Sequence, residues 1–421
     1  MDHFEYRSGR LCAEDVTIDA IAEAVGTPFY CYSSATLERH YRAYAEAFAD
    51  MPATVCYAVK ANPNLAVIRS LTRLGAGADV VSGGEMKRAL AAGVLPARIV
   101  FSGVGKSRDE LALALDAGIL QINVESEPEL AALSEIAEAK GVKAPVAVRV
   151  NPDIDAGTHE KITTGRRENK FGIEWTRAHE VYSRARAMPG LEVVGAAVHI
   201  GSQLLDLQPY REAYVRLRDL VAMLRADGHA IRNLDLGGGL GVPYQGEIAP
   251  SPADYAQVVR EVFRGVEGNL ILEPGRSIVG NAGVLVARVL YIKEGATRRF
   301  VILDAAMNDL IRPAMYGARH AIVPVAEPKT GTRFADVDVV GPVCESGDTF
   351  AKEVALPPLK AGDLVALRTA GAYGAAMASM YNARALTPEV MVRGGDFALV
   401  RDRITVDDML AREKTPAWLE G

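Results

Sequence analysis

Short apolar runs alternate with amphipathic stretches over residues 54–273 of the chain. The runs are β-rich, whereas the stretches between them carry signals for helices. Such alternation is typical of βα units that build a parallel sheet. The predicted strands are Thr54–Val59, Ala78–Val81, Ile99–Phe101, Ile119–Val124, Pro145–Val150, Glu192–His199, Asn233–Leu236 and Asn269–Glu273.

Helix-start signals stand between these predicted strands. Ser107–Glu110 and Ser126–Glu129 match the capping box, in which a serine and a glutamate satisfy the first amides of a helix. In Ser251–Pro252 the proline occupies a first helical position behind a capping serine. A further helix is predicted over about 33–49, ahead of the first strand.

Eight strands with their helices over about 240 residues predict a (β/α)8 barrel, since that fold takes about 250 residues. An open doubly wound sheet shows the same alternation, and the periodicity alone leaves both folds open. The functional side chains at the strand ends, described below, favour the barrel. Its predicted limits are residues 33–275.

The pattern changes after residue 275, where strand-like runs follow one another with few helical stretches. These runs predict a mostly β domain. A strand at Phe29–Tyr32 precedes the barrel, and we expect it to pair with the C-terminal sheet. The second domain is therefore predicted to combine residues 1–32 and 276–421. Its strand-like runs include Gly283–Ile292, Arg299–Leu303, Val337–Val340 and Asp363–Leu367.

Composition and charge narrow the class of protein. The chain of 421 residues is 49% hydrophobic with a net charge of −6, which argues against a nucleic-acid or membrane-surface partner. Val279–Ile292 is too short and too polar to span a bilayer, and the N-terminus lacks the pattern of a signal peptide. The four cysteines and seven histidines show no metal-site spacing, so we expect no metal and a reducing, cytoplasmic location.

Chemically versatile residues stand at the carboxyl ends of the predicted strands, where barrel enzymes place their active sites. Lys60 follows an apolar strand, and burial there would lower the pKa of its amine and suit it to a Schiff base. Gly237–Gly239 lets backbone amides approach a phosphate, although its spacing matches neither a dinucleotide fingerprint nor a P-loop. The strand ends, in order, are Lys60, Asp79, Ser102, Glu125, Arg149, His199, Gly237–Gly239 and Glu273.

Taken singly, these residues also suit ordinary structural roles: a loop lysine, a tight turn, a core histidine. Together they describe one site. Glu273 can hold a protonated ring nitrogen, Arg276 can bind a carboxylate or phosphate, and His199 can stack on a planar cofactor. A lysine, a phosphate-binding loop, a carboxylate and an imidazole predict a site for pyridoxal 5'-phosphate, whose ring is an electron sink.

Five motifs, in order along nearly the whole chain, resemble those of the alanine-racemase-like (fold type III) pyridoxal-dependent decarboxylases. They are Tyr57–Asn62, His199–Gln203, Gly237–Gly239, Glu273–Arg276 and Cys344–Asp348. Finer features resemble the members of that family that act on diaminopimelate. These are Asp155–His159, Thr163–Gly165, Glu168–Gly172, Met307–Tyr316 and Gly371–Gly374.

The resemblance implies a role for each candidate residue. Lys60 bonds to the cofactor, His199 stacks on its ring and Glu273 pairs with the ring nitrogen, while Cys344 serves as a proton donor. The groups around the phosphate are Ser202, Gly238, Gly239, Gly275 and Arg276, and Tyr373 also reaches the cofactor. The substrate-binding residues are Arg276, Arg312 and Tyr316 toward a carboxylate, Glu345 toward the distal ammonium, and Tyr373.

The implied reaction is decarboxylation of meso-2,6-diaminopimelate at its D-configured carbon to L-lysine and CO2. Either Cys344 or Lys60 protonates the carbon, and the sequence does not rank them. In the family the Cys-Glu segment enters the site from the partner subunit, which implies a homodimer with shared sites. The alternatives are a decarboxylase for carboxynorspermidine, arginine or ornithine, a non-catalytic regulatory homologue, and a nucleotide-dependent enzyme.

Overall fold

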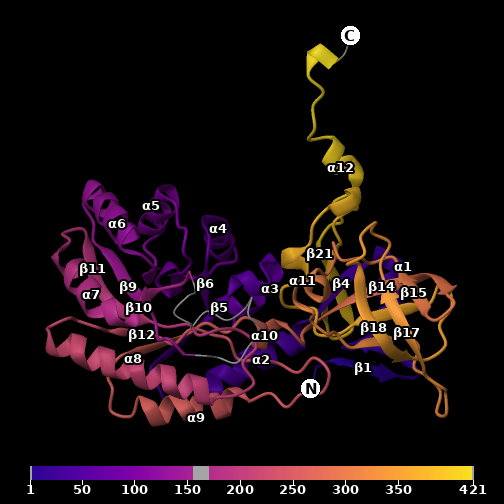
Figure 1. Cartoon of the computed structure of the whole chain (residues 1–421), viewed down its shortest axis with the longest axis horizontal. Coiled ribbons are helices and arrows are strands. Elements are labelled where there is room, and N and C mark those ends of the chain that lie inside the picture. The colour runs from indigo at the N-terminus through magenta and orange to yellow at the C-terminus, as the bar shows by residue number, and fades with distance from the viewer. Residues whose placement is uncertain (1, 155–169, 420–421) are drawn as a thin grey trace. The chain divides into compact units, whose positions relative to one another are not determined.

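The computed structural model describes residues 2–154 and 170–419, and the chain divides into two compact units. One unit comprises residues 37–279 and the other residues 1–36 with 280–421. The segments Asp155–His159 and Thr163–Gly165, and the first two residues of Glu168–Gly172, lie outside the described residues. Each unit is therefore considered separately (Figure 1).

The unit of residues 37–279 is a closed barrel of eight parallel strands, which confirms the predicted α/β fold. β8 pairs with β9 and β13 pairs with β5, so the barrel has no open edge. Its strands are β5 (Ala53–Ala58), β6 (Gly77–Val80), β7 (Ile99–Phe101), β8 (Gln121–Val124), β9 (Ala144–Asn151), β11 (Leu191–Ala197), β12 (Asn233–Asp235) and β13 (Asn269–Leu272). A short strand, β10 (Ile173–Glu174), pairs with the outside of β9.

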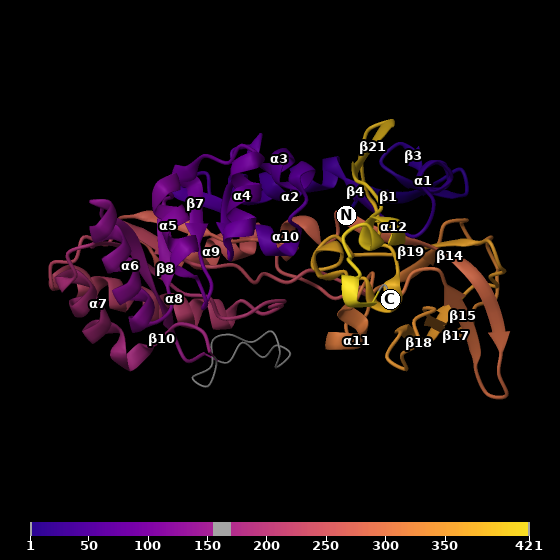
Figure 2. The same cartoon turned by 90° about the horizontal axis from the view of Figure 1, so that it is seen from above.

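Helices surround the barrel on its outer face, as Figure 2 shows from above. They are α2 (Ser34–Ala47), α3 (Leu65–Thr72), α4 (Gly83–Ala91), α5 (Arg108–Ala117), α6 (Glu127–Lys140), α7 (Ala178–Ala187), α8 (Gln208–Ala226), α9 (Pro252–Val262) and the short α10 (Arg276–Val279). The predicted capping box at Ser107–Glu110 is confirmed, and Ser251 caps α9 in the same way with Asp254.

The capping box predicted at Ser126–Glu129 is wrong in one half. The Ser126 side chain does accept from the Glu129 amide, but the Glu129 carboxylate turns away from the serine. It accepts instead from the Glu125 amide at 2.9 Å and pairs with the buried ammonium of Lys106 at 2.7 Å. A buried ammonium requires a nearby negative charge. The ion pair of Glu129 with Lys106 is therefore favoured over the second hydrogen bond of the capping box.

The second unit is mostly β. β4 (Phe29–Ser33) pairs antiparallel with β14 (Gly283–Glu294) and parallel with β20 (Glu389–Arg393), so the N-terminal strand joins the C-terminal sheet as predicted. The other strands are β1 (Phe4–Arg7), β2 (Arg10–Ala13), β3 (Val16–Thr17), β15 (Arg299–Leu303), β16 (Ile322–Pro324), β17 (Ala335–Val340), β18 (Thr349–Leu356), β19 (Leu364–Leu367) and β21 (Asp396–Arg401). The helices are α1 (Ile18–Val25), α11 (Arg312–Tyr316) and α12 (Val406–Leu410).

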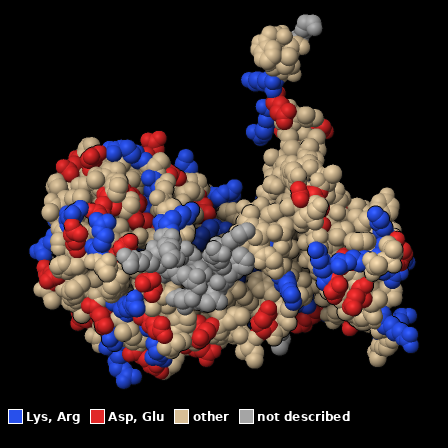
Figure 3. All heavy atoms as spheres, in the orientation of Figure 1, with Lys and Arg blue, Asp and Glu red and all other residues tan. Residues whose placement is uncertain are grey.

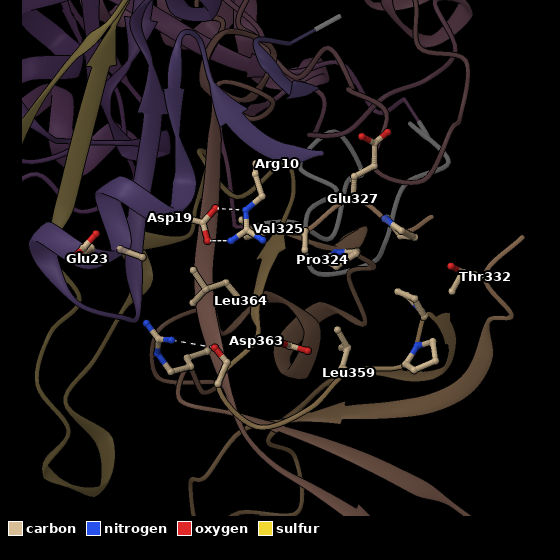
Figure 4. A pocket seen from close by; sticks show the side chains of 17 residues that line it. Arg10, Asp19, Glu23, Pro324, Val325, Glu327, Thr332, Leu359, Asp363 and Leu364 are labelled. Carbon is tan, nitrogen blue, oxygen red and sulfur yellow. Dashed lines mark hydrogen bonds and ion pairs between the residues drawn. The ribbon is translucent and has the colours of Figure 1, made fainter. Parts of the chain in front are cut away.

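Charge on the surface is mixed, with acidic and basic side chains interspersed over the outer helices of the barrel (Figure 3). Within the described ranges, no helix is both long and apolar enough to cross a membrane. The β unit contains a pocket of about 540 Å³ (Figure 4). Its arginines are already engaged, Arg10 with Asp19 and Arg288 with the Gly362 carbonyl, and none of the predicted site residues lines it.

Candidate active site

Lys60 is held at the carboxyl end of β5 by an ion pair. The strand ends one residue earlier than predicted, and Val59–Ala61 forms a single 3-10 turn that carries the lysine. The Lys60 Nζ lies 2.9 Å from Oδ2 of Asp79, a fully buried carboxylate on β6, while about a third of the lysine side chain stays exposed. The amine is therefore fixed in place and still accessible to a reactant.

Glu273 follows β13 and is buried among other carboxylates. The Ser102 hydroxyl donates to its Oε1 at 3.4 Å. Burial raises the pKa of Glu273 well above its usual range, the carboxylates of Asp235 and Asp79 raise it further, and the Lys60 ammonium opposes them. This shift favours the protonated form of Glu273 in the cofactor-free chain.

His199 lies two residues beyond the end of β11 and is held as a neutral imidazole. Its Nδ1 accepts a hydrogen bond from the Gly238 amide at 3.1 Å, which leaves the proton on Nε2. Burial lowers the pKa of His199 well below its usual range, and the Arg149 and Lys60 cations lower it further. Arg149 itself pairs with the buried Glu125 at 3.0 Å, so two more of the predicted strand-end residues are joined.

The glycines at the strand ends are packed so closely that a side chain would not fit. A Cβ on Gly238 would lie 2.1 Å from the Glu273 carbonyl oxygen, and one on Gly275 would lie 3.0 Å from the Ala61 Cβ. The amides of Gly239 and Gly275 donate to no other group in the described part of the chain. Two glycine amides that are not covered by a side chain and have no other acceptor among the described residues can donate hydrogen bonds to the oxygens of a phosphate.

Arg276 is buried beside these glycines and organises two hydroxyl groups. Its guanidinium donates to the Ser202 Oγ at 2.9 Å and to the Tyr244 hydroxyl at 2.6 Å. Together these residues fit pyridoxal phosphate: an accessible amine, a buried carboxyl group, a neutral flat imidazole, and amides with a hydroxyl and a guanidinium. The structure thus brings together the predicted residues that lie in the barrel.

The remaining predicted site residues belong to the β unit. Arg312 and Tyr316 begin and end the short helix α11. Arg312 is buried, with Nη1 3.2 Å from His320 Nε2, whose Nδ1 in turn lies 2.9 Å from the Arg368 carbonyl oxygen. Packing inside the β unit, rather than solvent, thus orients this arginine.

Cys344 and Glu345 lie exposed on the loop between β17 and β18. The buried Asp348 carboxylate shapes this loop by accepting from the amides of Met307 and Val343, each at 2.7 Å. The Cys344 amide donates to the Asn382 Oδ1 at 2.9 Å. The loop therefore presents a thiol and a carboxylate at its surface on a backbone held by side chains.

Tyr373 is half-buried and adopts a left-handed backbone with a φ of 56°. This conformation is uncommon for a residue with a large side chain and often marks a functional position. The next residue, Gly374, is tightly packed, since a Cβ there would lie 2.5 Å from the Ala370 carbonyl oxygen. The backbone that follows Tyr373 is therefore closely packed.

Sequence reasoning missed several polar groups inside the barrel. Gln121 and Asn123 on β8, and Asn233 and Asp235 on β12, are buried and joined by hydrogen bonds across the barrel. The signal was present, because polar residues at every second position interrupt two otherwise apolar strands. Among the described residues, no group of three or more His, Cys, Asp or Glu is arranged to hold a metal ion.

Comparisons with known proteins agree with this site. Residues 34–280 match the family model described as "Pyridoxal-dependent decarboxylase, pyridoxal binding domain". A Pseudomonas aeruginosa protein named diaminopimelate decarboxylase is 52% identical over 413 residues, covering 98% of this chain and 99% of the relative.

Two solved structures are similar along most of their length. The diaminopimelate decarboxylase of Helicobacter pylori complexed with L-lysine has a TM-score of 0.90 and 44% identity, covering 93% of this chain and 98% of that one. The enzyme of M. jannaschii in complex with L-lysine has a TM-score of 0.94 and 38% identity, covering 99% of both chains. The chain therefore belongs to the pyridoxal-dependent decarboxylases, which confirms pyridoxal phosphate as its cofactor.

Proposed function

We propose that this chain decarboxylates meso-2,6-diaminopimelate at its D-configured carbon, giving L-lysine and CO2, the last step of lysine biosynthesis. The observation that carries the proposal is the near-full-length identity of about half to a curated diaminopimelate decarboxylase. The buried groups around Lys60 support the same chemistry, because they match what a pyridoxal-dependent reaction requires.

In this proposal the barrel residues hold the cofactor. Lys60 bonds to it, His199 offers a neutral ring for stacking, and Glu273 serves the ring nitrogen. The phosphate contacts are Ser202, the backbone amides of Gly238, Gly239, Gly275 and Arg276, and the Arg276 side chain, with Tyr373 reaching the cofactor from the β unit. When bound, the pyridoxal ring supplies an electron sink for the electron pair left behind as CO2 departs. The Gly238 amide already donates to His199, so Gly239 and Gly275 are the stronger phosphate donors.

The substrate contacts come from residues with both signs of charge. Arg276, Arg312 and Tyr316 hold carboxylate groups, Glu345 holds the distal ammonium, and Tyr373 also contacts the substrate. A buried arginine such as Arg312 favours a carboxylate partner, since its guanidinium offers several donors in a fixed fork. After CO2 leaves, Cys344 or Lys60 returns a proton to the reacting carbon.

We infer further that two copies of the chain share their active sites. The barrel of residues 33–275 binds the cofactor, and the domain of residues 1–32 and 276–421 supplies substrate-binding and interface residues. Exposure of Cys344 and Glu345 supports this assignment, because both side chains are available to a second copy. The three other cysteines are buried as thiols, which suits the reducing cytoplasm.

The test is a panel of substrates assayed for release of CO2 by the purified protein. We expect release from meso-diaminopimelate and none from the LL isomer, which has no D-configured carbon. Faster release from ornithine, arginine or carboxynorspermidine would assign the chain to another activity of the family. Absence of release from every substrate, with the cofactor bound, would favour a non-catalytic regulatory protein.

A further inference from the structure

A short helix and the turn that follows it place His320 against Arg312 inside the β unit. Arg312 begins α11, and Gly317 ends the helix in the left-handed conformation, with a φ of 60°. The chain turns back after the helix, so His320 lies beside a residue eight positions earlier. Its Nε2 is 3.2 Å from Nη1 of Arg312, and both side chains are buried.

The other nitrogen of the imidazole is anchored to the end of a strand. Nδ1 of His320 lies 2.9 Å from the carbonyl oxygen of Arg368, the residue that follows β19. The Arg368 amide donates to the Ala321 carbonyl oxygen at 2.8 Å, and β16, which begins at the next residue, pairs antiparallel with β19. The imidazole therefore lies between a paired strand end and the guanidinium of Arg312.

Arg368 holds the imidazole through its backbone, since its side chain is engaged elsewhere. The Arg368 guanidinium pairs with Asp2 at 2.5 Å and donates to the Phe4 carbonyl oxygen at 3.0 Å. The contact at Nδ1 is thus made with a neutral peptide group. Arg312 is the charged side chain that His320 contacts through Nε2.

These two contacts determine the protonation state of the imidazole. A carbonyl oxygen can only accept a hydrogen bond, so Nδ1 carries the proton and donates to Arg368. A guanidinium can only donate, so Nε2 carries no proton and accepts from Arg312. A cationic imidazole has N–H on both nitrogens and could not make the second bond. His320 is therefore neutral and fixed in one tautomer.

A neutral acceptor orients Arg312 and does not cancel its charge. A carboxylate in the place of the imidazole would form a salt bridge with the guanidinium and compete with a carboxylate that arrives on the substrate. We propose that His320 is a positioning residue, which holds the Arg312 guanidinium in the orientation that receives the carboxylate retained by the substrate. This inference rests on the proposed function, in which Arg312 binds a substrate carboxylate.

The test compares three substitutions of His320 in the protein loaded with pyridoxal phosphate. We would measure KM and kcat for CO2 release from meso-diaminopimelate, and the dissociation constant of L-lysine by calorimetry. L-lysine is the proposed product and still carries the retained carboxylate. His320→Gln keeps an acceptor oxygen near the place of Nε2, His320→Leu removes the acceptor, and His320→Glu replaces it with a carboxylate.

In His320→Leu we expect KM and the dissociation constant of L-lysine to rise about tenfold, the effect of one hydrogen bond to a charged group, with a smaller change in kcat. His320→Glu should weaken L-lysine further, because its carboxylate occupies the guanidinium. His320→Gln should bind L-lysine more tightly than either of these variants. The affinity for pyridoxal phosphate should be the same in all three.

Equal affinity of His320→Gln and His320→Glu for L-lysine would overturn the proposal, because these two variants differ in charge and hardly in size. This comparison does not depend on whether His320→Leu folds. A loss of cofactor affinity in parallel with the loss of L-lysine affinity would also overturn the proposal, since a residue that only supported packing would disturb both.

The control is His179→Glu, the same substitution at an exposed histidine of α7, which should leave every constant unchanged. Arg312→Leu separates the inference from the role of the arginine. If that variant loses affinity for L-lysine and the His320 variants do not, the proposal alone is overturned. Failure of the proposed function shows instead in the unchanged protein, which would then release no CO2 from meso-diaminopimelate, and the proposal would fall with it.

Discussion

The two units of the chain hold their reactive groups in opposite ways. In the barrel, cationic side chains pair with fully buried carboxylates, Lys60 with Asp79 and Arg149 with Glu125. In the β unit, Cys344 and Glu345 are exposed, and the Asn382 side chain accepts from the backbone amide of Cys344. Burial in the barrel raises the pKa of Glu273 and lowers the pKa of His199.

This difference indicates that the two units have different roles. A cofactor that stays bound through many reaction cycles gains from a site organised before it arrives, since no reorganisation is then needed. A group that meets each new substrate must remain accessible. The barrel therefore has the character of a cofactor site, and the exposure of Cys344 is consistent with the substrate-facing role that we propose for its loop.

The largest effect should come from removing the barrel amine. Lys60→Ala should eliminate the visible absorbance of the bound cofactor and reduce activity to background, because no other amine forms the covalent link. Lys87→Ala, an exposed lysine on α4, is the matched control and should behave as the unchanged protein. A cofactor adduct that borohydride still fixes to the Lys60→Ala protein would refute the role of Lys60.

The loop should affect turnover without affecting the cofactor. In Cys344→Ala we expect kcat to fall by about 10²- to 10⁴-fold, the range of general acid catalysis, with unchanged affinity for pyridoxal phosphate. Absorbance titration and initial rates separate the two quantities. A parallel loss of cofactor affinity would instead make Cys344 a structural residue.

Mixing the two inactive variants tests whether Lys60 of one copy and Cys344 of another copy form one active site. In an equal mixture of Lys60→Ala and Cys344→Ala, half of the dimers are mixed, and each mixed dimer holds one intact site of two. Activity should then recover to about a quarter of the unchanged level, a statistical estimate for a two-fold symmetric pair. Recovery should be absent before subunits exchange, and continued inactivity after exchange counts against shared sites.

Burial of Glu273 should also be visible in the stability of the cofactor-free protein. Its pKa is raised on folding, so this carboxyl stabilises the fold below its ordinary pKa and loses that contribution as pH rises toward the folded value. Glu273→Gln removes the titration, and its unfolding free energy should fall less steeply above the ordinary pKa. A tenfold change in the acid dissociation constant on folding corresponds to about 1.4 kcal/mol. Parallel urea-unfolding curves across pH would contradict this.

The smallest effect belongs to a helix cap that contains none of the candidate site residues. Ser107→Ala removes the capping box of α5 and should lower the unfolding free energy by about 1 kcal/mol. Turnover should not change. Denaturant midpoints measure the loss, and a midpoint equal to that of the unchanged protein would show that the cap contributes nothing.

Local pattern was enough to predict the strands but not what lies inside the barrel. Parallel strands buried on both faces read as continuous apolar runs, so Ile99–Phe101 was placed to the residue and Thr54–Val59 within one. The bond between Asn123 and Asp235 joins residues 112 positions apart, and no local pattern encodes such a pairing. The same limit explains the error at Glu129, whose partner Lys106 lies on another segment.

The close packing of Gly238 has a consequence for how this sequence can vary. A Cβ at this position would overlap the backbone of the Glu273 segment, at 2.1 Å from a carbonyl oxygen that has no room to yield. Every single-nucleotide change of a glycine codon that is not silent introduces either a residue with a side chain or a stop codon. In a library of all single substitutions selected for growth, position 238 should therefore retain glycine alone. Other positions at this end of the barrel should accept substitutions.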